Sequence, residues 1–337
     1  MKKYLLPLCL ILVTFPLFAQ ETETPSPWKC SGVVGLNASA TGLVNWAAGG
    51  NNNVNGVAFG KVRLLYNENN LSWETNLNLE YGLSYIDQKD DAFQKSSDVI
   101  DFNTKLGWQF HKAWYLTASA GFKSQMAFGR AYDGTEADNP IISKFLSPSY
   151  TDISLGIDWK PNSIFSLYLS PVAGKITTAY VGNAVEAANP GLREEMQKKY
   201  ATWVYSNEAN ADGTYDKIYK NAKAELGLSF KGGVNYAYKD LKIITTLGLF
   251  TPYAWDKTEM KDANGLFIGY RDNNRRFGNF DVDWDTSISY QFLKCLNVTL
   301  STSLKYYNGV KIADKEGHAT ERVQFKGILG LGVGYSF

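Results

Sequence analysis

The sequence predicts an all-β fold, namely a transmembrane, antiparallel, up-and-down β-barrel of about twelve strands with short periplasmic turns and longer extracellular loops. Three observations predict it. Apolar and polar residues alternate with a period of two along nearly the whole chain. The alternating stretches run ~10–17 residues, whereas soluble strands average ~5–6 and a tilted membrane strand needs ~9–11. Short and long connections alternate strictly, which is typical of outer-membrane barrels.

The composition fits a barrel that is apolar outside and polar inside. Of 337 residues, 14% are aromatic and 30 are Gly, yet the mean hydropathy is −0.25. This low value excludes a membrane protein built from several apolar helices. The 34 Lys and Arg residues against 33 Asp and Glu leave a formal charge of +1. Such a balance argues against a nucleic-acid partner, since those binding proteins usually carry a basic excess.

The first residues predict export from the cytoplasm. Lys2 and Lys3 precede an apolar run from Leu5 to Phe18, and the small residue Ala19 follows. This is the pattern of a secretory signal peptide. The expected domains are a signal peptide (1–19), a periplasmic N-terminal segment (20–30) and an outer-membrane β-barrel (31–337). The expected location is therefore the outer membrane of a Gram-negative bacterium.

The strands are placed by alternation and the turns by its interruptions. In one stretch, the odd positions from Leu71 to Tyr85 are apolar or Thr, and the even positions are Ser, Glu, Asn or Gly. The expected strands cover residues 31–46, 54–66, 71–85, 97–110, 113–128, 150–159, 164–174, 222–238, 241–251, 280–292, 296–307 and 321–337. Tight turns are expected at 67–70, 111–113, 160–163, 239–240 and 293–295. Aromatic residues beside these turns would form an interfacial girdle.

One long connection, about 175–221, contains a predicted helix. Asn189 is a candidate N-cap and Pro190 suits the first helical position. Glu194 and Glu195 each precede a Lys by four residues, which is the favourable orientation for ion pairs along a helix. The helix could cover the barrel mouth, contact a partner or pack on its own loop, and we favour the last.

The final strand ends on an aromatic residue. Its apolar positions are Leu329, Leu331, Val333, Tyr335 and Phe337, and Gly or Ser stands between them. A terminal Phe337 on an amphipathic last strand resembles the signal that the outer-membrane insertion machinery reads. The expected partners are therefore this machinery, outer-membrane lipid and lipopolysaccharide.

A set of motifs resembles a known family. The segment Asn45–Gly50, which runs into three further Asn residues, looks like its hallmark. The other matching residues are Trp73, Tyr81, Gly82, Lys95, Ser96, Ser97, Asp98 and Gln125. Together they resemble the domain-of-unknown-function family DUF3078, best over residues 28–250. The resemblance implies a secreted barrel of Bacteroidetes-type bacteria and supplies no catalytic residue.

No catalytic residue, metal or cofactor is expected, and we predict that the protein is not an enzyme. His111 lies in a short turn, and His318 lies in the last long loop beside acidic residues, so a barrel hydrolase is only a weak alternative. The acidic loop residues Asp133, Glu136 and Asp138 lack the spacing of a known calcium loop. The sequence has no phosphate loop or dinucleotide fingerprint.

The inward face of the strands carries charges of both signs in equal number. The lumen-lining candidates are Arg63, Glu74, Asp101, Lys105, Lys123, Asp281, Asp283, Asp285, Lys305 and Lys326. Unpaired charges are costly in a narrow lumen, so we expect pairing. Hairpin register sets Arg63 opposite Glu74, Asp101 opposite Lys123, and Asp283 opposite Lys305.

The charge balance favours a small passive or substrate-limited channel for small solutes. The rival interpretation is a structural or assembly barrel whose lumen is filled by its own side chains. Cys30 and Cys295 are the cysteines left after signal cleavage, and both fall on the periplasmic side. They could form a disulfide. However, two inter-strand steps give ~10 Å against the ~4.4–6.8 Å a disulfide needs, so free thiols are the alternative.

Overall fold

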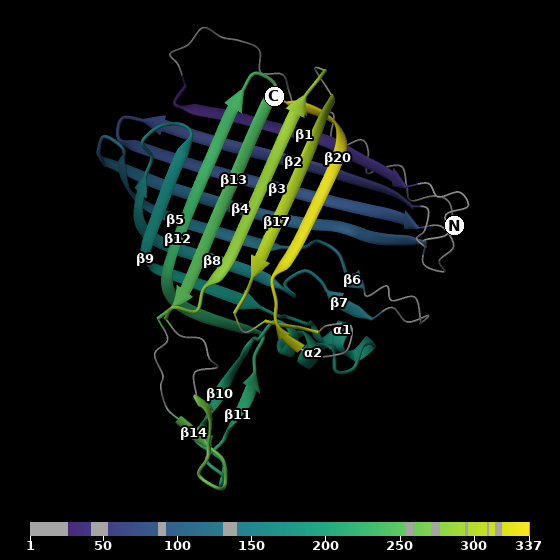
Figure 1. Ribbon diagram of the computed structural model, residues 1–337, viewed down its shortest axis with the longest axis vertical. Coiled ribbons are helices and arrows are strands. Elements are labelled where there is room, and N and C mark those ends of the chain that lie inside the picture. Colours follow the sequence, from purple (N-terminus) through teal and green to yellow (C-terminus); the bar gives the residue numbers. More distant parts are fainter. Residues whose placement is uncertain are drawn as a thin grey trace.

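The computed structural model describes residues 26–41, 53–86, 92–130, 140–253, 259–270, 277–293, 296–308, 310–313 and 319–336. Twelve long antiparallel strands form a closed barrel (Figure 1). Around the ring they follow the order β1-β2-β3-β4-β5-β8-β9-β12-β13-β16-β17-β20. The predicted fold class is confirmed.

The barrel strands lie close to their expected positions. They are β1 (Trp28–Thr41), β2 (Asn53–Glu68), β3 (Leu71–Ile86), β4 (Phe93–His111), β5 (Trp114–Ser124), β8 (Ser149–Trp159), β9 (Phe165–Thr178), β12 (Ala222–Tyr238), β13 (Leu241–Pro252), β16 (Asp281–Gln291), β17 (Leu296–Tyr306) and β20 (Gln324–Ser336). The first strand begins at Trp28 rather than at residue 31, so Cys30 lies inside β1.

Ring closure leaves the barrel strands without an open sheet edge. The first and last strands pair from Val33 with Ser336 to Ala38 with Leu331. Closure matters because backbone N–H and C=O groups facing lipid find no water to bond. A membrane barrel also needs an apolar outer face. On β3, the outward residues Leu71, Trp73 and Leu79 are 40%, 43% and 39% exposed. Such a row would be unfavourable in water and is suited to lipid.

Short turns join the strands at one end of the barrel, here called the short-turn end. Asn69 and Lys239 begin two of these turns with φ of 51°. Aromatic rings gather beside the turns: Trp28 lies 5.0 Å from Tyr66 and 5.8 Å from Trp73, centroid to centroid. This cluster matches the predicted interfacial girdle, where amphipathic rings sit at a membrane surface.

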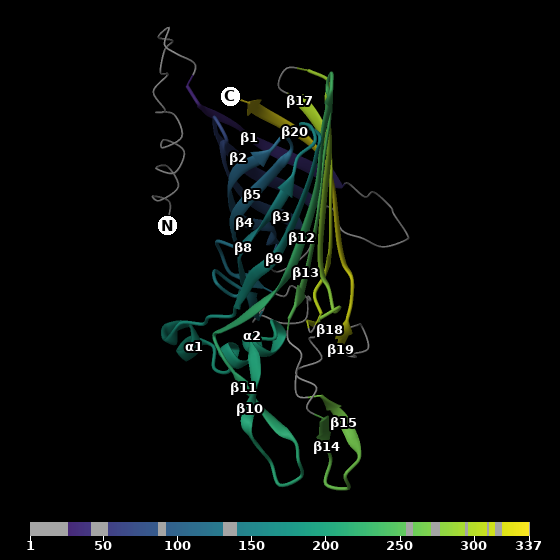
Figure 2. The same ribbon diagram turned by 90° about the vertical axis from the view of Figure 1, so that its left-hand side faces the viewer.

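Longer connections gather at the opposite, long-loop end, and some of them project far from the barrel (Figure 2). They contain β6 (Gly129–Arg130), β7 (Ile141–Ser143), α1 (Asn183–Ala188), α2 (Leu192–Lys199), β10 (Trp203–Ala209), β11 (Tyr215–Tyr219), β14 (Glu259–Lys261), β15 (Phe267–Tyr270), β18 (Lys311–Ala313) and β19 (Ala319–Glu321). Neither helix among the described residues is long and apolar enough to cross a bilayer.

The predicted helix is in fact two short helices, and its predicted N-cap is wrong. Asn189 closes α1, and Gly191 precedes α2 with φ of 88° and no side-chain cap. Glycine adopts such a φ without strain, so Gly191 allows the chain to change direction between the two helices. The predicted Glu194–Lys198 ion pair forms, with 2.7 Å between Oε1 and Nζ.

The helical loop packs mainly on itself, as favoured above. Leu192 and Met196 are buried against Ala179 and Val181 of the same connection, and against Ile141 of β7. The end of α2 also bonds β7, because Lys199 Nζ and Tyr200 Oη donate to the Ile142 carbonyl at 3.1 and 2.9 Å. Burial lowers the pKa of the Lys199 ammonium and raises the pKa of the Tyr200 hydroxyl.

Candidate functional site in the barrel lumen

The three predicted ion pairs of the lumen wall all form. Asp283 lies opposite Lys305, as the register argument required, and their Oδ1 and Nζ atoms are 2.9 Å apart. Asp101 lies opposite Lys123, with 3.7 Å between Oδ2 and Nζ. These two hairpin registers are confirmed.

The register of the first hairpin was predicted wrongly by two residues. Glu68, not Tyr66, lies opposite Leu71, because β2 continues to a turn formed by Asn69 and Asn70 alone. Arg63 therefore faces Asn76. The ion pair survives because diagonal neighbours lie within reach of a long side chain. Arg63 Nε contacts Glu74 Oε1 at 2.7 Å.

Other ion pairs join strands that are not neighbours. Lys105 of β4 reaches Asp158 of β8 at 2.9 Å, and the Asp158 side chain is fully buried. Lys231 of β12 reaches Asp152 of β8 at 2.8 Å. The period of two in the sequence puts all four residues on the inward face of the strands. It does not identify their partners, because contacts between strands that are not adjacent depend on how the ring curves.

Near the long-loop end, an aromatic and ionic group reaches across the lumen. It is here called the constriction and consists of Tyr150, Lys175, Phe250, Asp281 and Tyr307. The Tyr150 and Tyr307 rings stack with centroids 5.5 Å apart. Tyr150 belongs to β8 and Tyr307 follows β17, five strands away in a ring of twelve. The stack therefore spans the lumen almost from one wall to the other.

Lys175 fills the middle of the constriction. Its Nζ lies 2.6 Å from Asp281 Oδ2 and 4.8 Å from the Tyr307 ring centroid. The Tyr150 and Phe250 centroids lie 5.7 and 5.6 Å away. Cation–π contacts of this kind strengthen when water is excluded. Lys175 is absent from the predicted lumen set because β9 was expected to end at residue 174, whereas it continues to Thr178.

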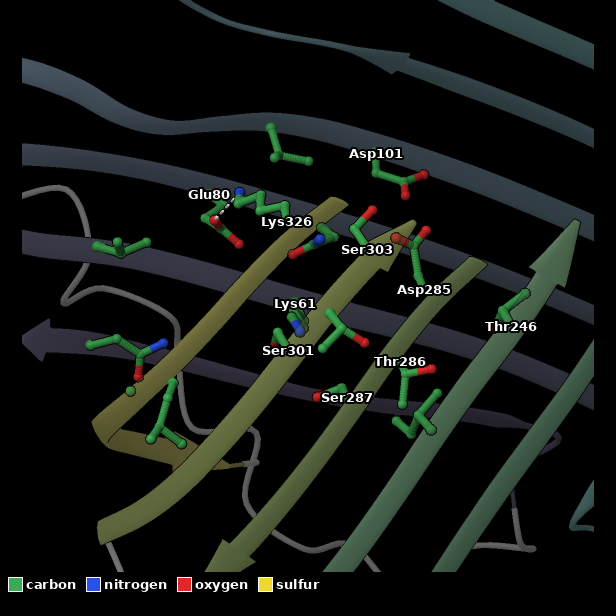
Figure 3. A pocket seen from close by; sticks show the side chains of 18 of the residues that line it. Lys61, Glu80, Asp101, Thr246, Asp285, Thr286, Ser287, Ser301, Ser303 and Lys326 are labelled. Atoms are coloured by element: carbon green, nitrogen blue, oxygen red, sulfur yellow. Dashed lines mark ion pairs between the residues drawn. The ribbon is translucent and has the colours of Figure 1, made fainter. Parts of the chain in front are cut away.

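A polar cavity of about 380 Å³ lies within the lumen (Figure 3). At ~30 Å³ per water molecule, this is room for about a dozen waters or one small solute. Its charged lining residues are Lys61, Glu80, Asp101, Lys123, Asp285, Lys305 and Lys326. Ser, Thr and Asn side chains supply most of the remaining polar surface, including Thr286, Ser287, Ser301 and Ser303. None of its lining residues is aromatic.

The motif residues Lys95, Asp98 and Gln125 form a buried cluster outside the lumen, here called the latch. Lys95 Nζ lies 2.8 Å from Asp98 Oδ2 and donates to Gln125 Oε1 at 2.9 Å. The Asp98 carboxylate accepts the backbone N–H groups of Met126 and Ala127 at 2.7 and 2.8 Å. The latch thus fixes the start of the β5–β8 loop to the first part of β4.

Several predicted features lie outside the described residues. They are Cys295, His318, Phe337, the acidic loop Asp133, Glu136 and Asp138, and the motif segment 45–52. Cys30 is described and belongs to β1. Within the described ranges, no group of three or more His, Cys, Asp or Glu side chains is arranged to hold a metal ion.

The fold and its lumen define a twelve-stranded, membrane-type β-barrel with a polar interior. Residues 38–129 match the family described as a protein of unknown function (DUF3078). The resemblance noted from the motifs is confirmed over that range, which is narrower than the expected 28–250. It includes the latch residues Lys95, Asp98 and Gln125.

No curated protein matches this chain. Among solved structures, it is similar to the COG4313 outer membrane channel from Pseudomonas putida F1, with 10% identity, a TM-score of 0.38, and coverage of 93% of this chain and 96% of that one. It is also similar to the translocator domain of the autotransporter NalP from Neisseria meningitidis, with 10% identity, a TM-score of 0.34, and coverage of 91% and 88%. At this low sequence identity and TM-score, the similarity indicates nothing about the activity of this chain.

Proposed function

We propose that the chain is an outer-membrane barrel of a Gram-negative bacterium that acts as a narrow, substrate-limited channel. The apolar outward face, the closed ring and the predicted signal peptide support the location. In this orientation the short-turn end faces the periplasm and the long-loop end faces lipopolysaccharide. The terminal Phe337 strand would be read by the insertion machinery, and no catalytic step is involved.

The polar cavity is the observation that carries the channel proposal. A barrel that served only as a scaffold would gain stability by filling this space with side chains, because cavities cost packing energy. Here about 380 Å³ stays open and is lined by hydroxyl, amide and charged groups. These are groups that a hydrated solute can use in place of its lost water contacts.

The paired charges predict weak ion selectivity. Four Lys and three acidic side chains line the cavity, so the two signs nearly cancel. A ring of one sign would select ions strongly, whereas alternating signs leave little net field along the wall. Small polar solutes should therefore pass in preference to large ionic currents.

Enlarging the constriction by mutation tests whether the barrel conducts small solutes. The full-length protein is reconstituted into liposomes, and swelling is measured in isosmotic solutions of small sugars. We expect slow swelling for the native chain and at least about fivefold faster swelling for Tyr150→Ala/Tyr307→Ala, because this change removes the stack that spans the lumen. A matched control is Tyr253→Ala, whose ring stacks on Phe277 outside the constriction.

The constriction also favours a second candidate, a structural or assembly barrel with a filled lumen. Tyr150, Lys175 and Tyr307 narrow the long-loop end, and the pocket beside them has a volume of about 20 Å³. The same experiment decides between the two. If neither the native chain nor the double variant admits any solute, the structural role is favoured and the channel proposal fails.

A further inference from the structure

The charges around the cavity come from two walls of the ring. Asp101 of β4 and Asp285 of β16 come from opposite walls of the ring, and Figure 3 shows Glu80 beside Lys326. Lys61 comes from β2 and Asp285 from β16, four strands apart around the ring. Each wall of the cavity therefore carries charges of both signs, and Lys61 and Asp285 face it from different walls.

Of the three ion pairs that the cavity's lining charges form among the described residues, two are longer than the 2.9 Å pair of Lys305 with Asp283. Lys123 lies 3.7 Å from Asp101, and Lys326 lies 4.0 Å from Glu80. By contrast, the pair between Lys175 and Asp281 in the constriction measures 2.6 Å. The charges facing the cavity are thus only partly neutralised by one another.

Two charges in the cavity have no ion-pair partner within the described part of the chain. Lys61 has only a distant contact, 6.0 Å from its Nζ to the Phe59 ring centroid. Asp285 lines the cavity together with Lys123, but Lys123 pairs with Asp101. Isolated charges cost free energy wherever hydration is restricted, so water or a solute must compensate both of them.

Only one class of small solute compensates both charges at once. An anion would be attracted by Lys61 and repelled by Asp101 and Asp285, and a cation would meet the opposite pattern. A neutral sugar supplies hydrogen bonds but no charge, and the cavity has no aromatic ring on which a sugar could stack. A solute with an ammonium and a carboxylate group matches both unpaired charges.

We propose that the lumen cavity binds a small zwitterion, an α-amino acid or a short peptide, with its carboxylate toward Lys61 and its ammonium toward Asp285. This rests on the proposed channel function, because it names the solute class of the same lumen. The volume of about 380 Å³ admits a dipeptide together with some retained water.

Binding of diglycine to the detergent-solubilised, full-length protein tests the site directly. By titration calorimetry, we expect Lys61→Gln and Asp285→Asn each to weaken binding about tenfold, since each removes one charge-assisted contact. Lys61→Arg should retain binding. Lys242→Gln is the matched control, because Lys242 shares its strand face with Ile244 and Thr246 but does not line the cavity. Each variant is first shown to be folded by its heat-modifiable migration in gels.

The inference is overturned if the native chain does not bind diglycine, if both variants bind it unchanged, or if arabinose binds equally well. Swelling assays in the Tyr150→Ala/Tyr307→Ala background separate this result from the channel proposal. If diglycine binds but no solute enters the liposomes, the site stands and the channel fails. If arabinose and diglycine enter at equal rates that Asp285→Asn does not alter, the channel stands and the site fails.

Discussion

At the scale of single residues, Asp283 links the lumen wall to the constriction. Its Oδ1 accepts both Lys305 Nζ, at 2.9 Å, and Tyr307 Oη, at 2.7 Å. Asp283 therefore positions one ring of the stack in the constriction. A change at this carboxylate or its lysine partner should affect the barrel and the constriction together.

Charge reversal at Lys305 should damage folding more than it alters solute passage. Lys305→Glu places two carboxylates opposite each other in a half-buried wall, which should cost about 1–3 kcal/mol. The free energy of unfolding in urea, measured in lipid vesicles, checks this. The swap Asp283→Lys/Lys305→Glu should recover most of the loss. Equal stabilities for the native chain and Lys305→Glu would contradict the account.

Gly82 is required by close packing rather than by backbone conformation. A Cβ at this position would lie 2.7 Å from Ser96 Oγ and 2.9 Å from Val57 Cγ2, below normal contact distances. Gly82→Ala should therefore destabilise the barrel by about 1–3 kcal/mol through overpacking. Gly56→Ala is the matched control, since nothing lies within 4 Å of its added carbon. The same unfolding measurement should show a lower free energy of unfolding for Gly82→Ala and little change for Gly56→Ala.

At the scale of elements, a bulge creates the latch. Gly82 pairs with Ser97 and Leu83 with Lys95, so Ser96 is an extra residue in β4. The extra residue shifts the alternation by one position, which brings Lys95 and Asp98 together. A strict period of two cannot reveal this cluster, and only the family resemblance drew attention to its residues.

Loss of the latch should loosen the β5–β8 loop and leave the barrel intact. Asp98→Ala removes the acceptor of the Met126 and Ala127 N–H groups and leaves the nearly buried Lys95 without its carboxylate. Hydrogen exchange of those two amides should accelerate at least about tenfold, since bonds to charged groups are worth ~1.5–3 kcal/mol. Glu194→Gln, in an exposed pair, is the control and should change nothing there. Unchanged exchange in Asp98→Ala would contradict the proposed role.

The sequence predicted the strands well because alternation repeats over many residues, and it predicted turns less well because each depends on one or two residues. The β12–β13 turn falls at residues 239–240, as expected. The β2–β3 turn is two residues shorter than expected. Arg63 therefore lies opposite Asn76 rather than opposite Glu74. The charged lining was predictable from inward positions, whereas the stack of Tyr150 on Tyr307 depends on closure of the ring and was not.

At the scale of the whole molecule, the stagger of the strands bears on the cysteines. As expected, β20 lies between β1 and β17. However, Val333 of β20 pairs with Leu36 of β1 and with Leu296 of β17, so Leu296 is level with Leu36. Leu36 lies six residues after Cys30 on β1. Six strand residues span ~20 Å. Cys295 lies outside the described residues, so the disulfide stays a prediction, and the stagger favours the alternative of two free thiols.

Mass analysis without reduction tests the thiol state. We expect two alkylatable thiols in the mature protein, because closing the disulfide would require β1 or the β16–β17 turn to move far along the wall. A mass that shows no alkylation until a reductant is added would instead establish the disulfide. It would also show that the ends of these strands depart from the stagger seen here.

The central claim is that one closed barrel combines a balanced, polar cavity with a constriction at its long-loop end. Single-channel recording in planar bilayers tests it most directly. The native chain should give small or no currents with weak ion selectivity, and Tyr150→Ala/Tyr307→Ala should give larger currents that are still weakly selective. Large, strongly cation- or anion-selective currents from the native chain would contradict both the constriction and the balanced lumen.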